Sequence, residues 1–177
     1  MSRIRILLMK KALVVLSLAA VAGASLAQST AITADGLTLR LGGVYPLERA
    51  TRKITANMIG VGLDFPVRSL VTKADAYVSV DWYGKSASGA KGNMFPVMYN
   101  HRLYMNPSEA VGNRSFFNVG VGLVQIDVTK AKTTYGARFG LGKELGQNLS
   151  VEGVLLWSSD ANGAKANSLA AFLGYRF

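Results

Sequence analysis

The fold is decided by the last ten residues of the chain, Ser168-Leu169-Ala170-Ala171-Phe172-Leu173-Gly174-Tyr175-Arg176-Phe177. Every second residue, counted back from Phe177, is apolar, whereas the other face carries Arg176 and Gly174, with Phe172 as its one large apolar exception. A period of two indicates a β-strand with two unlike faces. No charged tail follows the final aromatic residue, so we expect the apolar face to meet an apolar environment outside the strand.

The amino-terminal residues have the pattern of an export signal. Four basic residues precede the apolar run 12–24, and Ser25-Leu26-Ala27 places small residues where a signal peptidase reads, so we expect cleavage before Gln28. The alternative is a membrane-anchoring helix, but a run of about 13 residues is short of the roughly 20 that a spanning helix needs. We therefore predict a signal peptide over 1–27, a periplasmic leader over 28–36 and one domain over 37–177.

The composition excludes several classes of function. Cleavage removes four of the 20 basic residues and no acidic one, which leaves 16 against 10 and a moderately basic mature chain. Nucleic acid is not an expected partner, because an export signal sends the chain away from it and no basic helix is present. The chain has no cysteine and one histidine, so we expect no disulfide framework, no metal cluster and no cofactor.

Alternation with a period of two continues through the whole mature chain. It predicts eight strands of about ten residues, the length that crosses a bilayer when tilted. The predicted strands are 37–47, 58–67, 76–83, 94–104, 117–124, 134–144, 149–158 and 168–177. After Leu123 the pattern inverts, since Gln125 and Asp127 take the apolar parity, and this predicts a bulge or a strand end there.

Alternation alone fits two kinds of barrel, a soluble lipocalin-like barrel whose apolar face points inward and a membrane barrel whose apolar face points to lipid. Glycines recur on the face opposite the bulky apolar one, as a narrow lumen requires. Aromatic residues of the apolar face gather near both strand ends, as at two membrane interfaces. The predicted loops near Trp82 are longer than the turns near Gly146 and Asn106, as outside loops are longer than periplasmic turns. These features favour the membrane barrel.

The carboxyl-terminal alternation resembles the signature of bacterial outer-membrane β-barrels that the barrel-assembly machinery reads. The resemblance implies that Leu173, Tyr175 and Phe177 form an assembly signal and that this machinery is a partner during biogenesis. It implies a bacterial outer-membrane location.

The resemblance widens at 95–104, Phe-Pro-Val-Met-Tyr-Asn-His-Arg-Leu-Tyr, and at 117–123, Phe-Asn-Val-Gly-Val-Gly-Leu. These segments look like the small barrels of the OmpW and OmpA transmembrane type. The family implies an all-β, eight-stranded antiparallel up-and-down transmembrane β-barrel with a structural envelope role, or a route for small or hydrophobic solutes. Unlike OmpA, this chain ends at the barrel, so we expect no tether to the cell wall by a periplasmic domain.

Eight charged residues share the small-residue face, four of each sign. Unpaired charges in a narrow lumen are costly, so equal numbers suggest an ion-pair network that closes it. The alternative is that some of them lie at water-filled ends without partners. The predicted lumen residues are Arg40, Asp64, Asp81, Arg102, Arg138, Glu144, Glu152 and Arg176.

Two patterns suggest an enzyme, and we interpret neither as one. Glu144 and Glu152 resemble a glycosidase carboxylate pair, but neighbouring arginines would keep both ionised. His101 resembles the outward-facing histidine of membrane lipid A deacylases, yet Leu103 stands where that motif has serine, and no Ser/His/Asp set follows from spacing. A non-enzymatic barrel is predicted, with a lipid A-modifying enzyme as a further alternative.

Basic residues also gather in the loops predicted to lie outside. A cationic rim can bind phosphates of outer-membrane lipid such as lipopolysaccharide, although a solvated set of charges needs no partner. The candidate rim consists of Arg49, Arg52, Lys53, Lys85 and Lys91. A monomer is the favoured oligomeric state.

Overall fold

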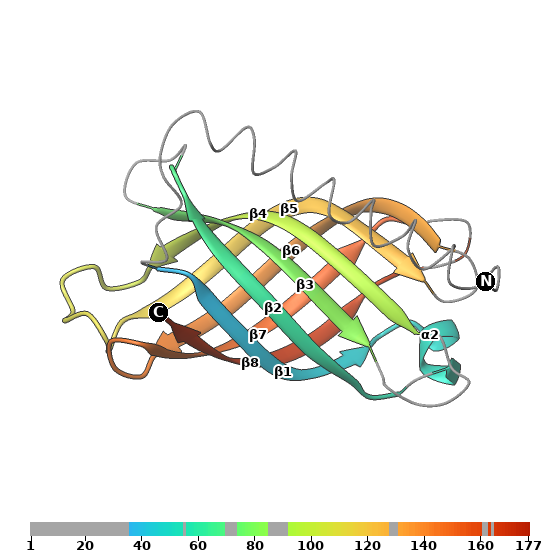
Figure 1. Ribbon diagram of the computed structural model, residues 1–177, viewed down its shortest axis with the longest axis horizontal. Coiled ribbons are helices and arrows are strands. Elements are labelled where there is room, and N and C mark those ends of the chain that lie inside the picture. Colours follow the sequence, from blue (N-terminus) through green and yellow to red (C-terminus); the bar gives the residue numbers. More distant parts are fainter. Residues whose placement is uncertain are drawn as a thin grey trace, which may run out of the picture. The chain divides into compact units, whose positions relative to one another are not determined.

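The computed structural model describes residues 36–54, 56–69, 74–84, 92–127, 131–160, 163 and 165–177, and within these ranges it forms a closed β-barrel (Figure 1). Eight strands follow one another around the barrel in sequence order, each antiparallel to its neighbours, so the predicted fold is confirmed. The strands are β1 Thr38–Pro46, β2 Met58–Val67, β3 Asp75–Gly84, β4 Asn93–Tyr104, β5 Ser115–Asp127, β6 Ala131–Glu144, β7 Leu149–Ser158 and β8 Ser168–Arg176.

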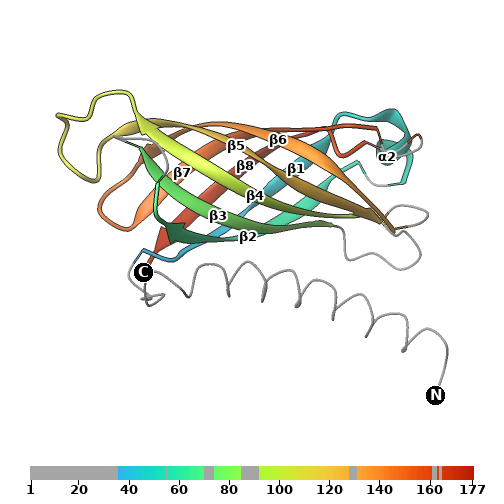
Figure 2. The same ribbon diagram turned by 90° about the horizontal axis from the view of Figure 1, so that it is seen from above.

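The barrel closes where β8 pairs with β1. The seam runs from Thr38 opposite Arg176 to Pro46 opposite Ser168. Two backbone bonds extend it, from the Gly36 amide to the Phe177 carbonyl at 3.0 Å and from the Phe177 amide to the Leu37 carbonyl at 2.9 Å. Figure 2 shows the tilted strands from a second direction. No unpaired sheet edge is left between β1 and β8.

The two ends of the barrel are distinguished by what they carry. The short helix α2 (Arg49–Ile54), where the sequence predicts only a loop, lies at one end, and Phe177 lies at the other (Figure 1). We call these the α2 end and the Phe177 end. No helix of the described residues is long and apolar enough to cross a membrane. The predicted signal peptide and all of the leader except Gly36 lie outside the described residues.

The apolar face of the sheet points outward, as the sequence predicts. Tyr135 is 73% exposed and Phe139 is 49% exposed, whereas Arg138 between them is fully buried. Trp157 and Leu155 are likewise exposed, while Glu152 on the same strand is buried. A soluble barrel would have the opposite arrangement, so the lipocalin-like alternative is wrong.

The prediction of a bulge or strand end after Leu123 is wrong. β5 continues to Asp127 without a break in its pairing to β6, with Gln125 opposite Thr133 and Asp127 opposite Ala131. The alternation of apolar and polar residues inverts because the surroundings of both faces of β5 change near its end, while the strand itself stays regular. Val124 and Ile126 fill an apolar part of the lumen, and the outward face becomes polar beyond the last aromatic positions.

The inward glycines make room for particular large side chains. A Cβ on Gly60 would lie 2.6 Å from the Phe172 ring, and one on Gly142 would overlap the Phe116 ring. Similar overlaps would occur between Gly62 and the Arg40–Asp81 pair. The sequence attributes these glycines to a narrow lumen, and the structure adds that the lumen is filled.

The predicted difference in loop length holds at some connections only. Leu145 to Asn148 is a short turn in which Gly146 has a positive φ of 98°. The connection 105–114 at the same end is long, however, whereas at the α2 end only three residues of sequence separate β5 from β6. The 105–114 loop is ordered by its own hydrogen bonds, from Glu109 to Asn106 and from Asn113 to Ala110.

Candidate functional site

The centre of the lumen holds a chain of buried ion pairs. Arg40 contacts Asp64 at 2.8 Å and Asp81 at 2.6 Å through the same guanidinium nitrogen. Arg138 contacts the other oxygen of Asp81 at 3.5 Å and Glu152 at 3.1 Å. These five side chains are at most 3% exposed. Charges of both signs thus alternate across the barrel and neutralise one another in a space with little water.

Polar groups extend this chain to the remaining strands. The Asn118 side-chain amide donates to Glu152 at 2.7 Å, and its oxygen accepts from Arg102 at 3.4 Å. Arg102 lies over the rings of Phe116 and Tyr77, at 4.4 and 5.2 Å from their centroids. It forms no ion pair within the described part of the chain, so the predicted role for Arg102 becomes hydrogen bonding and cation–π contact.

We call Arg40, Asp64, Asp81, Arg102, Asn118, Arg138 and Glu152 the charged layer. Its members come from β1 to β7, and Arg40 reaches β8 by lying 5.1 Å over the Phe172 ring. Several of its buried polar atoms have no protein partner, among them Arg40 Nη1, Asp64 Oδ2 and Arg138 Nε. Such atoms are suited to internal water molecules.

A second layer fills the lumen between the charged layer and the α2 end. We call it the apolar layer, and it is a single cluster of buried residues: Val44, Met58, Tyr83, Met94, Met98, Val124, Ile126, Val154, Leu156, Ala166 and Phe172. Tyr83 and Phe172 meet with ring centroids 5.9 Å apart. The Ala166 amide donates to Ser158 Oγ at 2.7 Å, so the segment before β8 closes over this layer.

Glu144 and Arg176 lie apart from the charged layer, at the Phe177 end. Arg114 makes a two-pronged contact with Glu144, at 3.0 and 2.9 Å, and the Gly112 amide donates to the same carboxylate at 2.8 Å. Arg176 is 3.9 Å away. The hydrogen bond with Glu144 raises the pKa of the Arg114 guanidinium. Glu144 and Arg176 thus form, with Arg114, a second ion-paired group at the Phe177 end, and the eight predicted lumen residues do not make one continuous network.

The sequence analysis missed Arg114, which lies in a loop where alternation carries no information. It also left Asn118 unassigned, although its inward parity was available. A cavity of about 310 Å³ opens at the Phe177 end, beside Arg176. Asp64, Tyr77 and Arg102 form its inner wall.

His101 faces outward on β4, and the structure gives it a serine partner that spacing did not suggest. Ser69 Oγ, just beyond β2, lies 3.4 Å from His101 Nδ1. The ring of Tyr99 meets the imidazole edge-on at 5.0 Å. Leu103 still occupies the position where the deacylase motif has serine. Within the described ranges, no group of three or more His, Cys, Asp or Glu side chains is placed to hold a metal ion.

The candidate rim is partly described. Arg49, Arg52 and Lys53 lie on α2, where Arg52 is 5.7 Å over the ring of the outward Tyr45. Lys85 and Lys91 fall outside the described residues. The residues of the predicted assembly signal, Leu173, Tyr175 and Phe177, all face outward and are 54%, 45% and 58% exposed.

Solved structures resemble this barrel. The amino-terminal β-barrel domain of OprF from Pseudomonas aeruginosa has a TM-score of 0.51 at 13% identity, over 81% of this chain and 98% of that one. The outer membrane enzyme PagL also has a TM-score of 0.51 at 13% identity, over 78% and 96%. Neisserial surface protein A has a TM-score of 0.47 at 9% identity, over 80% and 94%. No protein-family model and no curated protein sequence matches the chain.

At these identities the likeness concerns the fold alone. The chain has the eight-stranded barrel fold of known outer-membrane proteins, as the resemblance to the OmpW and OmpA type implies. One of the neighbours is an enzyme. The expectation that this chain is not an enzyme therefore stays a prediction.

Proposed function

We propose that this chain is an integral protein of the bacterial outer membrane with a structural role in the envelope and a lumen closed to solutes. The observation that carries the proposal is the filling of the lumen by two successive layers. The charged layer is held together by ion pairs, and the apolar layer beside it is packed from Phe172 on one wall to Met98 on another. A solute would have to displace both.

The outer surface supports the membrane location. Exposed aromatic side chains ring the α2 end, among them Tyr45, Tyr135 and Trp157, and Tyr175 and Phe177 lie near the other end. Strands of nine to 14 residues between these belts suit a hydrocarbon core of about 30 Å when tilted. In this proposal the Phe177 end faces the periplasm, because β1 begins and β8 ends there and the short turn from Leu145 to Asn148 lies at that end.

Planar-bilayer recording tests the closed lumen. The full chain is refolded, its folded state is verified by a shift in gel mobility on heating, and it is then added to a bilayer beside a general porin as positive control. We expect no steady conductance. A large steady current from the heat-modifiable protein would contradict the proposal and favour a narrow channel. The double variant Arg138→Met with Phe172→Ala, which opens both layers, is expected to conduct more than either single variant.

The channel alternative has one specific observation in its favour. The cavity at the Phe177 end reaches buried polar atoms, since Tyr77 OH and Asp64 Oδ2 have no protein partner. Water that enters there reaches the charged layer directly, and it would continue if the ion pairs and the apolar layer behind them rearranged. Uptake of small apolar compounds by cells that make the protein, lost in a deletion strain, would favour this alternative.

A lipid-modifying enzyme is a second candidate, because Ser69 and His101 are in contact on the outer wall. A serine hydroxyl beside an imidazole is the minimal arrangement for nucleophilic attack on an ester. The outer membrane enzyme PagL is an example of a barrel of this fold that has an enzymatic activity. Hydrolysis of ester lipids that is abolished in both Ser69→Ala and His101→Ala would establish this function, and unchanged lipids would remove it.

Two partners complete the proposal. The α2 cations would bind phosphates of outer-leaflet lipid, so replacing Arg49, Arg52 and Lys53 by Ser should reduce co-purified lipopolysaccharide.

The outward residues Leu173 and Phe177 would be recognised by the barrel-assembly machinery during insertion. Phe177→Ser should then lower the amount of heat-modifiable protein in cells more than it lowers refolding of the purified chain.

A further inference from the structure

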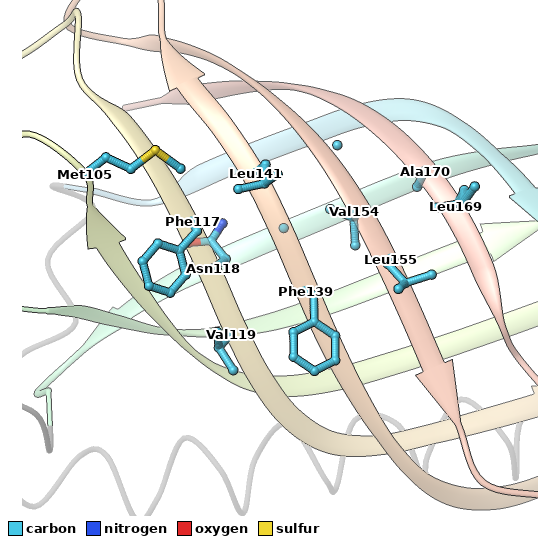
Figure 3. A pocket seen from close by; sticks show the side chains of 12 residues that line it. Met105, Phe117, Asn118, Val119, Phe139, Leu141, Val154, Leu155, Leu169 and Ala170 are labelled. Atoms are coloured by element: carbon cyan, nitrogen blue, oxygen red, sulfur yellow. The ribbon is translucent and has the colours of Figure 1, made fainter.

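The outer wall is hollowed over β5 to β8. Figure 3 shows this groove, which has a volume of about 540 Å³ and is lined almost entirely by carbon. Phe117 and Phe139 stand on one side and Leu155 on the other. The depth comes from Gly153, which faces outward without a side chain. A Cβ at this position would approach nothing closer than the Leu141 carbonyl at 4.0 Å.

A cation lies at the end of this groove nearest Phe177. Lys143 follows Leu141 by one outward position on β6, opposite Ser115 and Val151, and its side chain is exposed. It forms no salt bridge within the described part of the chain. Along the described strands, it is the one outward-facing position that holds lysine or arginine, so the positive charge stands at the edge of an apolar wall.

We propose that the groove holds an acyl chain of an anionic phospholipid whose phosphate lies on Lys143. This inference rests on the proposed function, because it requires the wall to face a membrane and the Phe177 end to lie in the leaflet nearest the periplasm. Phosphate and ammonium are complementary charges at the interface, and the stem of lysine can lie along apolar surface while its head reaches the phosphate. The Gly153 hollow then receives methylene groups that a bulkier side chain would exclude.

Another copy of this chain fits the groove less well. A symmetric dimer through the same surface would place identical patches face to face. It would therefore bring two Lys143 side chains to the same level of the wall with no acidic partner between them. Lipopolysaccharide belongs to the other leaflet in the proposed orientation. Both occupants remain distinguishable outcomes of the experiment.

Native mass spectrometry of the refolded full chain tests the site, with phosphatidylglycerol and phosphatidylcholine as probes. Gly153→Leu places a side chain in the groove, where its Cβ meets no protein atom closer than 4.0 Å, and Gly43→Leu is its matched control, since a Cβ at this outward glycine meets nothing within 4 Å. Lys143→Gln removes the cation, and Lys165→Gln removes one at the opposite end. We expect Gly153→Leu to lower retention of both probes, and Lys143→Gln to lower that of phosphatidylglycerol alone by about fivefold.

Equal retention of the two lipid probes by the Gly153→Leu and Gly43→Leu variants would overturn the inference. So would a dimer that Gly153→Leu dissociates, or lipid A that displaces phosphatidylglycerol in a Lys143-dependent manner. Failure of the inference differs from failure of the proposed function. A chain that never gives a heat-modifiable, vesicle-inserted form fails as a membrane barrel, whereas an inserted chain without specific retention fails only here.

Discussion

The charged layer and the apolar layer fill the same tube by opposite means. In the charged layer, Arg40 and Arg138 are completely buried and each is shared between two carboxylates. In the apolar layer, rings and methionines interlock, and Tyr83 OH has no protein partner. Removing one ionic partner exposes the charge it neutralised, whereas removing one apolar group leaves a void. The difference teaches that the charged layer is more vulnerable to single substitutions than the apolar layer.

The largest effect is expected from Arg138→Met. Asp81 and Glu152 would both lose a buried partner, and breaking such a pair costs about 4 to 5 kcal/mol. Urea unfolding in vesicles, followed by tryptophan fluorescence, measures the change in the free energy of unfolding. Arg52→Met on α2 is the control and should change it little. A loss below about 1 kcal/mol for Arg138→Met would indicate that the layer is hydrated and its pairs weak.

Phe172→Ala addresses the apolar layer. The cavity should lower the free energy of unfolding by about 3 kcal/mol, at the low end for a buried aromatic residue because long methionine side chains can move into the space. Leu173→Ala on the outward face of the same strand is the control, since lipid replaces the lost contacts. If both variants unfold at the same urea concentration, the ring does not pack as described.

Gly60→Ala sharpens the comparison by overfilling the apolar layer. Its Cβ would lie 2.6 Å from Phe172, so strain should cost about 1 to 2 kcal/mol. Gly43→Ala, outward on the neighbouring strand β1, should stay within about 0.5 kcal/mol of the wild type. Combining Gly60→Ala with Phe172→Leu should recover part of the loss. Additive losses in that double variant would argue against contact between the two positions.

The smallest effect is expected at the turn clamp, where Glu144→Gln weakens the contact with Arg114. Arg114 is partly solvent-accessible, so the cost should be about 1 kcal/mol. Amide hydrogen exchange of Gly112, which donates to Glu144, is the local measurement and should quicken. Exchange of amides beside Arg138 serves as the control. Acceleration there as well would mean that the clamp and the charged layer are coupled.

Alternation was enough to predict the strands, their number, and which face is buried. It also placed Arg138 and Glu152 inside, because parity decides the face, and the inward residues of the neighbouring strands β6 and β7 share the lumen. Parity cannot tell how far along the barrel a charge lies, and for that reason the prediction did not separate Glu144 and Arg176 from the residues of the charged layer. Register across neighbouring strands supplies this missing coordinate.

The apolar layer escaped prediction for a related reason. Met98 and Ile126 have inward parity. From the sequence alone, however, a large apolar residue on the small-residue face is interpreted as an exception to the alternation or as a bulge, because its neighbours across the barrel are not known. The contact between Ser69 and His101 also escaped prediction, because Ser69 lies in the connection after β2 while His101 lies on β4. Loop geometry of this kind has no periodic signal.

The charged layer has a consequence for how the barrel forms. Arg40 and Asp81 are separated by 41 positions and Arg138 and Asp81 by 57, so none of these attractions exists in an isolated hairpin. They arise only when the sheet curls, so that Asp81 on β3 can reach Arg40 on β1 and Arg138 on β6 through the lumen. Sliding β8 past β1 by a single residue would turn Arg40 or its partners toward hydrocarbon. The ion pairs therefore favour the alignment in which these inward charges meet one another in the lumen.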